Sequence, residues 1–190
     1  KALILTPTRE LAIQIMESFA AYGRHIPLKR SVIFGGVNQH AQVMALNQGS
    51  DIIVATPGRL LDLMNQGYVD LRSIQIFVLD EADRMLDMGF TDALKIVLAA
   101  CPEERQTLLL SATYPDEIKK ISAHCQKNPH EVSVESVHSD TNIEQHFYEL
   151  RDGDRKNVAV QQLLAHFKPQ SSIVFCNTKI QCQEVCDLLR

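Results

Sequence analysis

Several features that would place a protein in a specialised class are absent from this sequence. It contains no run of about 18 or more apolar residues, so a membrane-spanning helix is not expected. Its first residues, KALILTPTRE, lack the charged, apolar and small-residue zones of a signal peptide. None of the five cysteines falls in a CxxC spacing, which favours reduced thiols over a metal site or a disulfide framework. We therefore expect a cytoplasmic protein with no membrane partner.

An excess of basic residues is also missing. The sequence has 19 Lys and Arg against 23 Asp and Glu, which gives a formal net charge of −4. A protein that grips nucleic acid by bulk electrostatics would carry the opposite sign. Any contact with nucleic acid must therefore come from individually placed groups.

Short apolar runs alternate with amphipathic stretches along residues 1–135. Continuous β-branched runs are typical of strands buried on both faces, and their repeated alternation with helical patterns predicts an α/β fold, a parallel sheet flanked by helices. We expect strands at 2–5, 31–34, 51–55, 74–80, 106–110 and 130–135, and helices at 9–22, 38–48, 58–66, 92–100 and 115–125.

The polar stretch SVHSDTN predicts a linker, placed at residues 136–144, between a first domain at 1–135 and a second unit at 145–190. The second unit has two expected strands, QHFYEL and SSIVFCN, and two expected helices. Two strands are too few for a stable sheet domain. Because the chain also starts in a strand without methionine, we interpret it as a piece of a longer protein.

Polar clusters lie at the ends of six of the expected strands. In open parallel sheets, ligands bind beyond the carboxyl ends of the strands, so six such clusters predict one functional edge. In chain order the clusters are TPTRE, GG, TPGR, DEAD, SAT and CNT.

Two of these clusters place Thr and Pro directly before a helix. The free backbone N–H groups of a helix start bind phosphate, and Arg9 and Arg59 can add charge-assisted bonds. The glycines at 35–36 allow a ligand backbone to approach closely. The plainer alternatives are Thr as an N-cap, Pro as a helix starter and the glycines as a simple turn.

The acidic cluster follows a buried strand, IFVL. Asp80 and Glu81 match the Walker B pattern, in which an Asp holds Mg²⁺ on nucleotide phosphates and a second acid orients the attacking water. Acids at a helix start also favour the helix dipole, and this alternative applies most to Asp83 and Asp87. The hydroxyls of the SAT cluster can reach these carboxylates or can cap the helix that follows.

Together these motifs resemble those of DEAD-box ATP-dependent RNA helicases of superfamily 2. The matching segments appear in the family's order, and the text of the second unit is most similar to the bacterial DbpA-type branch. The segments are PTRELA at 7–12, GG at 35–36, TPGR at 56–59, DEAD at 80–83, SAT at 111–113 and IVFCNT at 173–178.

The resemblance implies a RecA-like first domain, the start of a second RecA-like domain, and RNA-stimulated, Mg²⁺-dependent ATP hydrolysis that unwinds short duplexes. Asp80 would hold Mg²⁺, Glu81 would activate water, and Asp83 would pair with Ser111 and Thr113. The residues implied in contacts with the RNA backbone are Pro7, Thr8, Arg9, Glu10, Gly35, Gly36, Thr56, Pro57, Gly58, Arg59, Asn177 and Thr178.

The sequence departs from this family's pattern in two places. It contains no P-loop, G-x-x-x-x-G-K-[ST], since none of its eight glycines precedes a Lys, and it lacks the late arginine-rich motif. We therefore expect these residues alone to hydrolyse ATP poorly or not at all. A non-catalytic RNA-binding module is the main alternative, and a nucleotide binder unrelated to RNA would leave PTRELA, GG and TPGR unexplained. Resemblance to the DbpA-type branch suggests ribosomal RNA or pre-ribosomal particles as partners, by analogy alone.

Overall fold

The structure, a computed structural model, describes residues 1–134, 144–151 and 156–190. The chain divides into two compact units, Lys1–Glu131 and Val132–Arg190. Most of the expected linker, 136–144, lies outside the described residues, so the domain limits stay a prediction. Within the three described ranges, no helix is long and apolar enough to cross a membrane.

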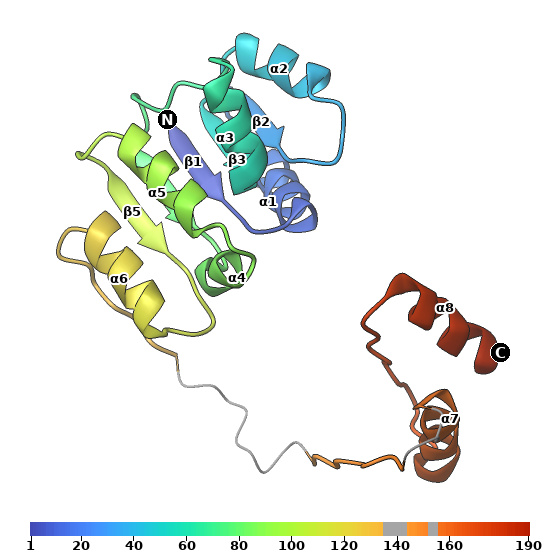
Figure 1. The fold of residues 1–190 in the computed structure, drawn as a ribbon. Helices are drawn as coiled ribbons and strands as arrows, with labels where there is room; N and C mark the ends of the chain where they lie inside the picture. The colour runs from blue at the N-terminus through green and yellow to red at the C-terminus, as the bar shows by residue number, and fades with distance from the viewer. Residues whose placement is uncertain (135–143, 152–155) are drawn as a thin grey trace. The chain divides into compact units, whose positions relative to one another are not determined.

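The first unit is built on a parallel sheet of five strands in the order β2-β3-β1-β4-β5 (Figure 1). All four strand pairs are parallel, which confirms the sheet type predicted from the continuous apolar runs. The strands are β1 Ala2–Leu5, β2 Arg30–Ile33, β3 Ile52–Ala55, β4 Ile76–Leu79 and β5 Gln106–Leu109.

Helices cover both faces of this sheet. Along β1, Leu3 and Leu5 face one apolar cluster and Ile4 faces the other, because successive strand side chains point to opposite faces. The first cluster receives α3, α5 and α6, whereas α1 packs on the other side through Ala12 (Figure 1). The helices of this unit are α1 Arg9–Tyr22, α2 His40–Asn47, α3 Pro57–Asn65, α4 Ala82–Asp87, α5 Thr91–Ala100 and α6 Asp116–Cys125.

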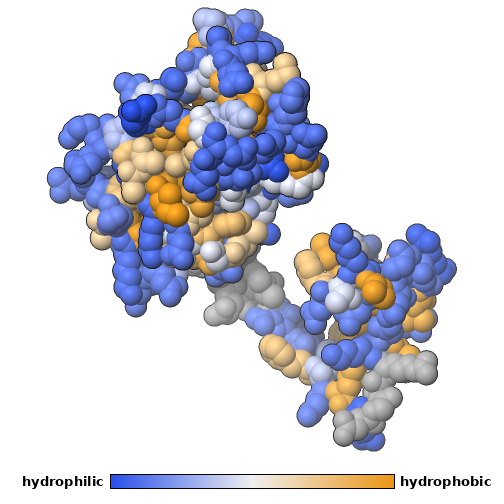
Figure 2. All heavy atoms as spheres, turned by 45° about the horizontal axis from the view of Figure 1, so that its top comes forward, coloured by the Kyte–Doolittle hydropathy of each residue, from blue (hydrophilic) through white to orange (hydrophobic). Residues whose placement is uncertain are grey.

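On the side of α1, part of the sheet remains open. Ile76 on β4 and Leu108 on β5 are 40% and 38% exposed, although both side chains point to this face. Figure 2, turned so that the top of Figure 1 comes forward, shows apolar surface between hydrophilic side chains elsewhere on the first unit. Burial of the sheet is thus most complete around β1 and β3, whose carboxyl ends carry two of the motif clusters.

The second unit differs from the sequence prediction, because its described residues form helices and no strand. It contains α7 Lys156–Phe167 and α8 Lys179–Leu188. The stretches 145–150 and 171–177, expected as strands, have no strand partner, and Ile173 and Phe175 are 80% and 90% exposed. A strand persists only where neighbours satisfy its backbone and cover a face.

The expected strand at 130–135 is likewise absent over its described part, residues 130–134. Val132 and Val134 are 76% and 84% exposed, so their β-branched side chains gain no burial there. The stretch is rich in β-branched residues, but β-propensity without a pairing partner does not produce a strand.

Candidate functional site

The acidic cluster lies at the carboxyl edge of the sheet, directly after β4. The Asp80 N–H donates to the Leu5 carbonyl at 2.9 Å, and the Ala82 N–H donates to the Leu110 carbonyl at 3.0 Å. These two bonds hold the chain against the strands on both sides of β4. The acids are therefore placed by the sheet itself and not by a free loop.

Glu81 has an unusual backbone conformation between β4 and α4. Its φ of 51° and ψ of 53° are left-handed, which is uncommon for a residue other than glycine. This conformation turns the chain from strand to helix within one residue, so that Asp80, Glu81 and Asp83 stay together. Strain of this kind, about 1–3 kcal/mol, persists where surrounding contacts hold it and is common at functional sites.

Asp83 joins the acidic cluster to the SAT cluster, 30 residues further along. Its Oδ2 accepts hydrogen bonds from the Thr113 N–H at 2.9 Å and the Thr113 hydroxyl at 2.8 Å. The Ser111 hydroxyl oxygen accepts a hydrogen bond from the Asp83 N–H at 3.2 Å. The residue preceding α6 is Pro115, with no side-chain cap. Neither SAT hydroxyl caps α6: the Thr113 hydroxyl contacts the Asp83 carboxylate, and the Ser111 hydroxyl contacts the Asp83 backbone.

The electrostatics of Asp83 follow from these contacts. Partial burial by itself would raise the pKa of Asp83, but the hydrogen bonds donated by Thr113, and that from the Arg84 N–H, outweigh it and hold the pKa below its usual value. Asp83 therefore stays ionised at neutral pH and accepts bonds from both sides.

The residues at this edge fit a magnesium ion held mainly through water. Asp80 uses one carboxylate oxygen to accept the Glu81 N–H at 3.0 Å, and Glu81 lies 3.8 Å from the Arg84 guanidinium. Among the described residues no group of three metal-ligating side chains occurs. Mg²⁺ on a nucleotide needs only one or two protein carboxylates, so this donor set suffices.

Three motif clusters meet in a second feature of the same edge, a shallow hollow of about 550 Å³. Residues from TPTRE, GG and TPGR share its wall with the segment that follows α4. The sequence-predicted residues in the wall are Pro7, Thr8, Arg9, Glu10, Gly35, Thr56, Gly58 and Arg59.

The two threonines of this hollow serve different purposes. Thr8 is the N-cap of α1, and its hydroxyl accepts the Leu11 N–H at 3.3 Å. Thr56 precedes α3 without making a side-chain cap, although it is buried. The plainer alternative, an N-cap, therefore holds for Thr8 and fails for Thr56. Pro57 is buried at the first position of α3, as expected of a helix starter.

The two arginines are held in place by the protein. Arg9 lies over the Phe34 ring at 5.1 Å, and Arg59 donates to the Val37 carbonyl at 3.1 Å and pairs with Asp62 at 3.6 Å. The Nη1 of Arg59 is buried without a hydrogen-bond partner among the described residues. A buried guanidinium nitrogen with an unused donor is a candidate contact for an anion.

The glycine pair leaves the hollow open on one side. Gly36 has a φ of 78°, which requires glycine, and a Cβ added at Gly35 would meet nothing within 4 Å. The pair is thus a turn, as the plainer alternative held. It also leaves free space beside Gly35 for a ligand.

Sequence reasoning assigned no role to three residues of the hollow: Asp62, Met88 and Phe90. Phe90 lies 3.9 Å from a Cβ placed on Gly58, so it forms the wall opposite TPGR. Met88 and Phe90 follow the DEAD cluster in the sequence, but their spacing from it gives no indication of which strand ends they face.

Asn177 and Thr178 belong to the second unit. Thr178 is the N-cap of α8 and accepts the Gln181 N–H at 3.2 Å, whereas Asn177 is exposed. Their assignment to an RNA contact stays a prediction, as do the roles of the residues in the first unit.

Comparison with known proteins agrees with the arrangement of these motifs. The family model described as DEAD/DEAH box helicase matches residues 1–121. The ATP-dependent RNA helicase DbpA of Escherichia coli is 45% identical over the whole of this chain, and DbpA of Bacillus subtilis is 38% identical. This chain spans 41% and 40% of those two relatives, less than half of their length.

Solved structures give the same result for the fold. A DEAD box protein from Methanococcus jannaschii matches all of this chain with a TM-score of 0.67 and 36% identity, over 50% of its own length. A hypothetical ATP-dependent RNA helicase from Sulfolobus tokodaii matches 99% of this chain, also with a TM-score of 0.67, over 55% of its own length. These matches confirm the RecA-like parallel sheet, and the chain belongs to the DEAD/DEAH box helicase family.

Proposed function

We propose that this chain is part of an ATP-dependent RNA helicase, in which RNA-stimulated ATP hydrolysis unwinds short duplexes. The observation that carries the proposal is the bond between Asp83 and Thr113 at 2.8 Å. It joins the acidic cluster to the SAT cluster at the same sheet edge as the three-motif hollow. A change in either cluster can therefore reach the other through one hydrogen-bonded pair.

The acids divide the chemistry between them. Asp80 would hold a magnesium ion through water, and that ion would neutralise charge on the nucleotide phosphates. Glu81 would accept a proton from the attacking water, since its carboxylate is about 43% exposed and not committed to a hydrogen bond at short range. Asp83, held ionised by Thr113 and Arg84, would position this segment relative to SAT.

The hollow would bind the sugar–phosphate backbone of RNA. Arg9 and Arg59 supply two guanidinium groups, and the starts of α1 and α3 supply free backbone N–H groups. Contacts to the backbone carry little sequence information, so this surface would accept many sequences. It also explains how a chain of net charge −4 can bind a polyanion.

The finer assignments rest on family resemblance alone. We propose that Asn177 and Thr178 add an RNA contact from the second unit, and that the domain limits near 135 and 145 separate two RecA-like bodies. Ribosomal RNA or pre-ribosomal particles as partners, a role in ribosome biogenesis and a cytoplasmic location are proposals of the same kind.

The test is RNA-stimulated ATPase activity in the protein at its full native length. We expect single-stranded RNA to stimulate turnover strongly, and Glu81→Gln to lower kcat by about 10²–10⁴-fold, since it removes the proton acceptor and leaves the shape unchanged. RNA binding in the presence of a non-hydrolysable ATP analogue should survive in the same variant. Glu103→Gln, the same change at an exposed residue away from the edge, is the matched control.

Two other results would contradict the proposal, and a third would overturn the expectation for these residues alone. RNA binding without turnover in the native protein would support the non-catalytic RNA-binding module. Turnover indifferent to RNA would support a nucleotide binder unrelated to RNA. RNA-stimulated turnover by residues 1–190 alone would overturn the expectation that a P-loop is required.

A further inference from the structure

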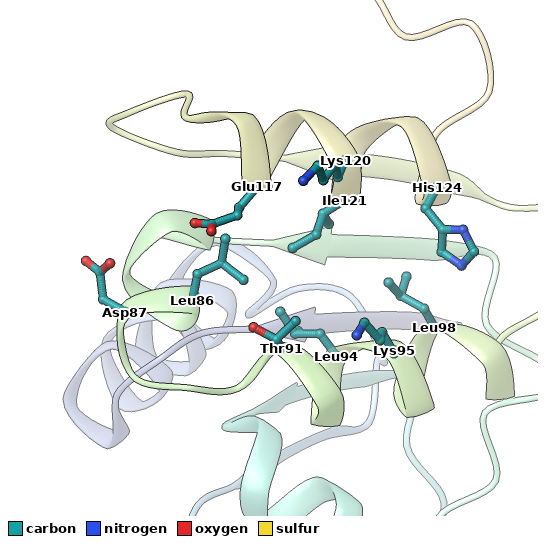
Figure 3. Close-up of a pocket in the computed structure, with 10 residues that line it drawn as sticks. All are labelled: Leu86, Asp87, Thr91, Leu94, Lys95, Leu98, Glu117, Lys120, Ile121 and His124. Atoms are coloured by element: carbon teal, nitrogen blue, oxygen red, sulfur yellow. The ribbon is translucent and has the colours of Figure 1, made fainter.

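A groove lies between α5 and α6, and it shares no lining residue with the hollow. It has a volume of about 590 Å³, and its floor is apolar (Figure 3). Leu94 and Leu98 in the floor are 1% and 7% exposed and belong to the main core cluster. These two leucines offer little surface themselves, and the apolar surface of the groove comes from Leu86 and Ile121, which are partly buried and pack against that cluster. No helix lies over the groove in the described part of the chain.

Both helices turn the same kind of face to this groove. Its lining residues recur at positions i, i+3, i+4 and i+7 on each helix, which is the spacing of a surface prepared for helix packing. They are Thr91, Leu94, Lys95 and Leu98 on α5, and Glu117, Lys120, Ile121 and His124 on α6, with Leu86 and Asp87 from α4 at one end.

Charges on the rim differ between the two ends of the groove. Asp87 and Glu117 lie near the end formed by α4, whereas Lys95 and Lys120 lie further along, and His124 marks the opposite end (Figure 3). Lys95 pairs with Asp92 at 3.3 Å on the solvent side. Among the described residues, Glu117 and Lys120 have no ion pair, so they are available to an occupant.

We propose that this groove binds an amphipathic helix from a partner protein. Such a helix would place apolar side chains on Leu86 and Ile121, above the buried Leu94 and Leu98. It would carry basic residues toward Asp87 and Glu117, and acidic residues toward Lys95 and Lys120. The lining length on α5, eight positions or about 10 Å, corresponds to two helical turns.

A helix suits the groove better than a small molecule does. Small-molecule sites combine an apolar wall with a few fixed, buried polar groups. Here the charged groups are long side chains on the rim, and the floor between the two helices is mainly apolar. That combination matches helix-in-groove recognition, in which apolar anchors give affinity and rim charges give orientation.

The test uses the chain with two synthetic helical peptides of roughly four turns. The first carries leucines at helical i, i+3 and i+4 spacing, lysines in its first turn and glutamates in its last. The second has the same composition with the charges exchanged. Binding is followed by fluorescence anisotropy, and its location by amide shifts in NMR spectra. We expect saturable binding of the first peptide with a Kd on the order of 10–100 μM, because a two-turn interface is small.

The double variant Lys95→Glu/Lys120→Glu should weaken binding of the first peptide by about three- to tenfold and improve binding of the second. Both lysines are exposed, so the fold should survive, and thermal unfolding verifies this. Lys119→Glu, the same change on α6 at a position that does not line the groove, should leave binding unchanged.

Three outcomes would overturn the proposal. They are no saturable binding up to about 1 mM, equal binding of both peptides by the wild type and the double variant, and amide shifts outside α4, α5 and α6. Self-association of the chain that the double variant abolishes would assign the groove to a second copy instead. None of these outcomes depends on ATP or RNA.

Discussion

The contact between Asp83 and the SAT cluster offers the most direct test of the site, through Asp83→Asn. Asp83 accepts three hydrogen bonds, from the Thr113 N–H, the Thr113 hydroxyl and the Arg84 N–H. An asparagine can keep its oxygen on Thr113, but its amide then faces the Arg84 N–H as a second donor. One bond is lost, and the other two lose their charge assistance.

The expected cost is about 1–2 kcal/mol, at the lower end for bonds to a charged group because Thr113 is exposed. For a unit of this size, that corresponds to a fall in Tm of roughly 3–10 °C. Thermal unfolding followed by circular dichroism measures it. Asp87→Asn, at an exposed residue of the same helix, is the matched control and should shift Tm by less than about 2 °C.

A double-mutant cycle with Thr113→Val isolates the pair. We expect a coupling free energy of about 0.5–1.5 kcal/mol between the two substitutions. Strict additivity, within about 0.3 kcal/mol, would show that Asp83 and Thr113 do not interact in solution. The reasoning that joins the acidic cluster to SAT would then be refuted.

The pH dependence of the same variant gives an independent check. The pKa of Asp83 is lower in the folded state than its usual value, so its stabilising effect is fully present above about pH 4. This effect is lost as the pH falls through the folded-state pKa. The difference in Tm between wild type and Asp83→Asn should therefore shrink on acidification. A difference that stays constant down to about pH 2.5 would argue against the lowered pKa.

Two further predictions concern the hollow. Gly36→Ala should destabilise the protein by about 1 kcal/mol because the φ of Gly36 is 78°. Gly35→Ala should have little effect, since its added Cβ would meet nothing within 4 Å. Equal Tm values for the two variants would contradict this prediction. Arg59→Lys should weaken binding of single-stranded RNA by about three- to tenfold in anisotropy titrations, because lysine cannot reach both the Val37 carbonyl and a phosphate. Unchanged affinity at low salt would remove Arg59 from the proposed interface.

Sequence patterns predicted those helices well whose start and end are marked by capping residues. The helix expected at 9–22 is α1 Arg9–Tyr22, because Thr8 caps its start and Gly23 follows its end. The alternative that placed Asp83 and Asp87 at a helix start holds for Asp83, in the first turn of α4, and is wrong for Asp87, the last residue of this six-residue helix. The expected strands at 145–150 and 171–177 were wrong for the described residues, since apolar composition does not supply a pairing partner.

The candidate site likewise has a part that the sequence predicted and a part that only the folded structure shows. The motif residues were identifiable by type, because carboxylates after a buried strand, and Thr-Pro before a helix, each imply chemistry on their own. The sequence did not show which of these residues would lie together in one hollow. Met88 and Phe90 come to line it beside TPGR only because α4 turns the chain back. Likewise, the two alternatives for SAT could be decided only by the contacts that Thr113 makes in the folded structure.

By itself, the sequence determined the alternation of strands and helices, the parallel sheet and the membership of its motifs in one family. The tertiary structure alone decided the strand order β2-β3-β1-β4-β5, which brings β4 and β5 together and places β1 between β3 and β4. The physical reason is that apolar periodicity reports which face of a strand is buried, but not which strand lies beside it. Pairing is chosen by the burial of the whole sheet, and with it the neighbours of each motif.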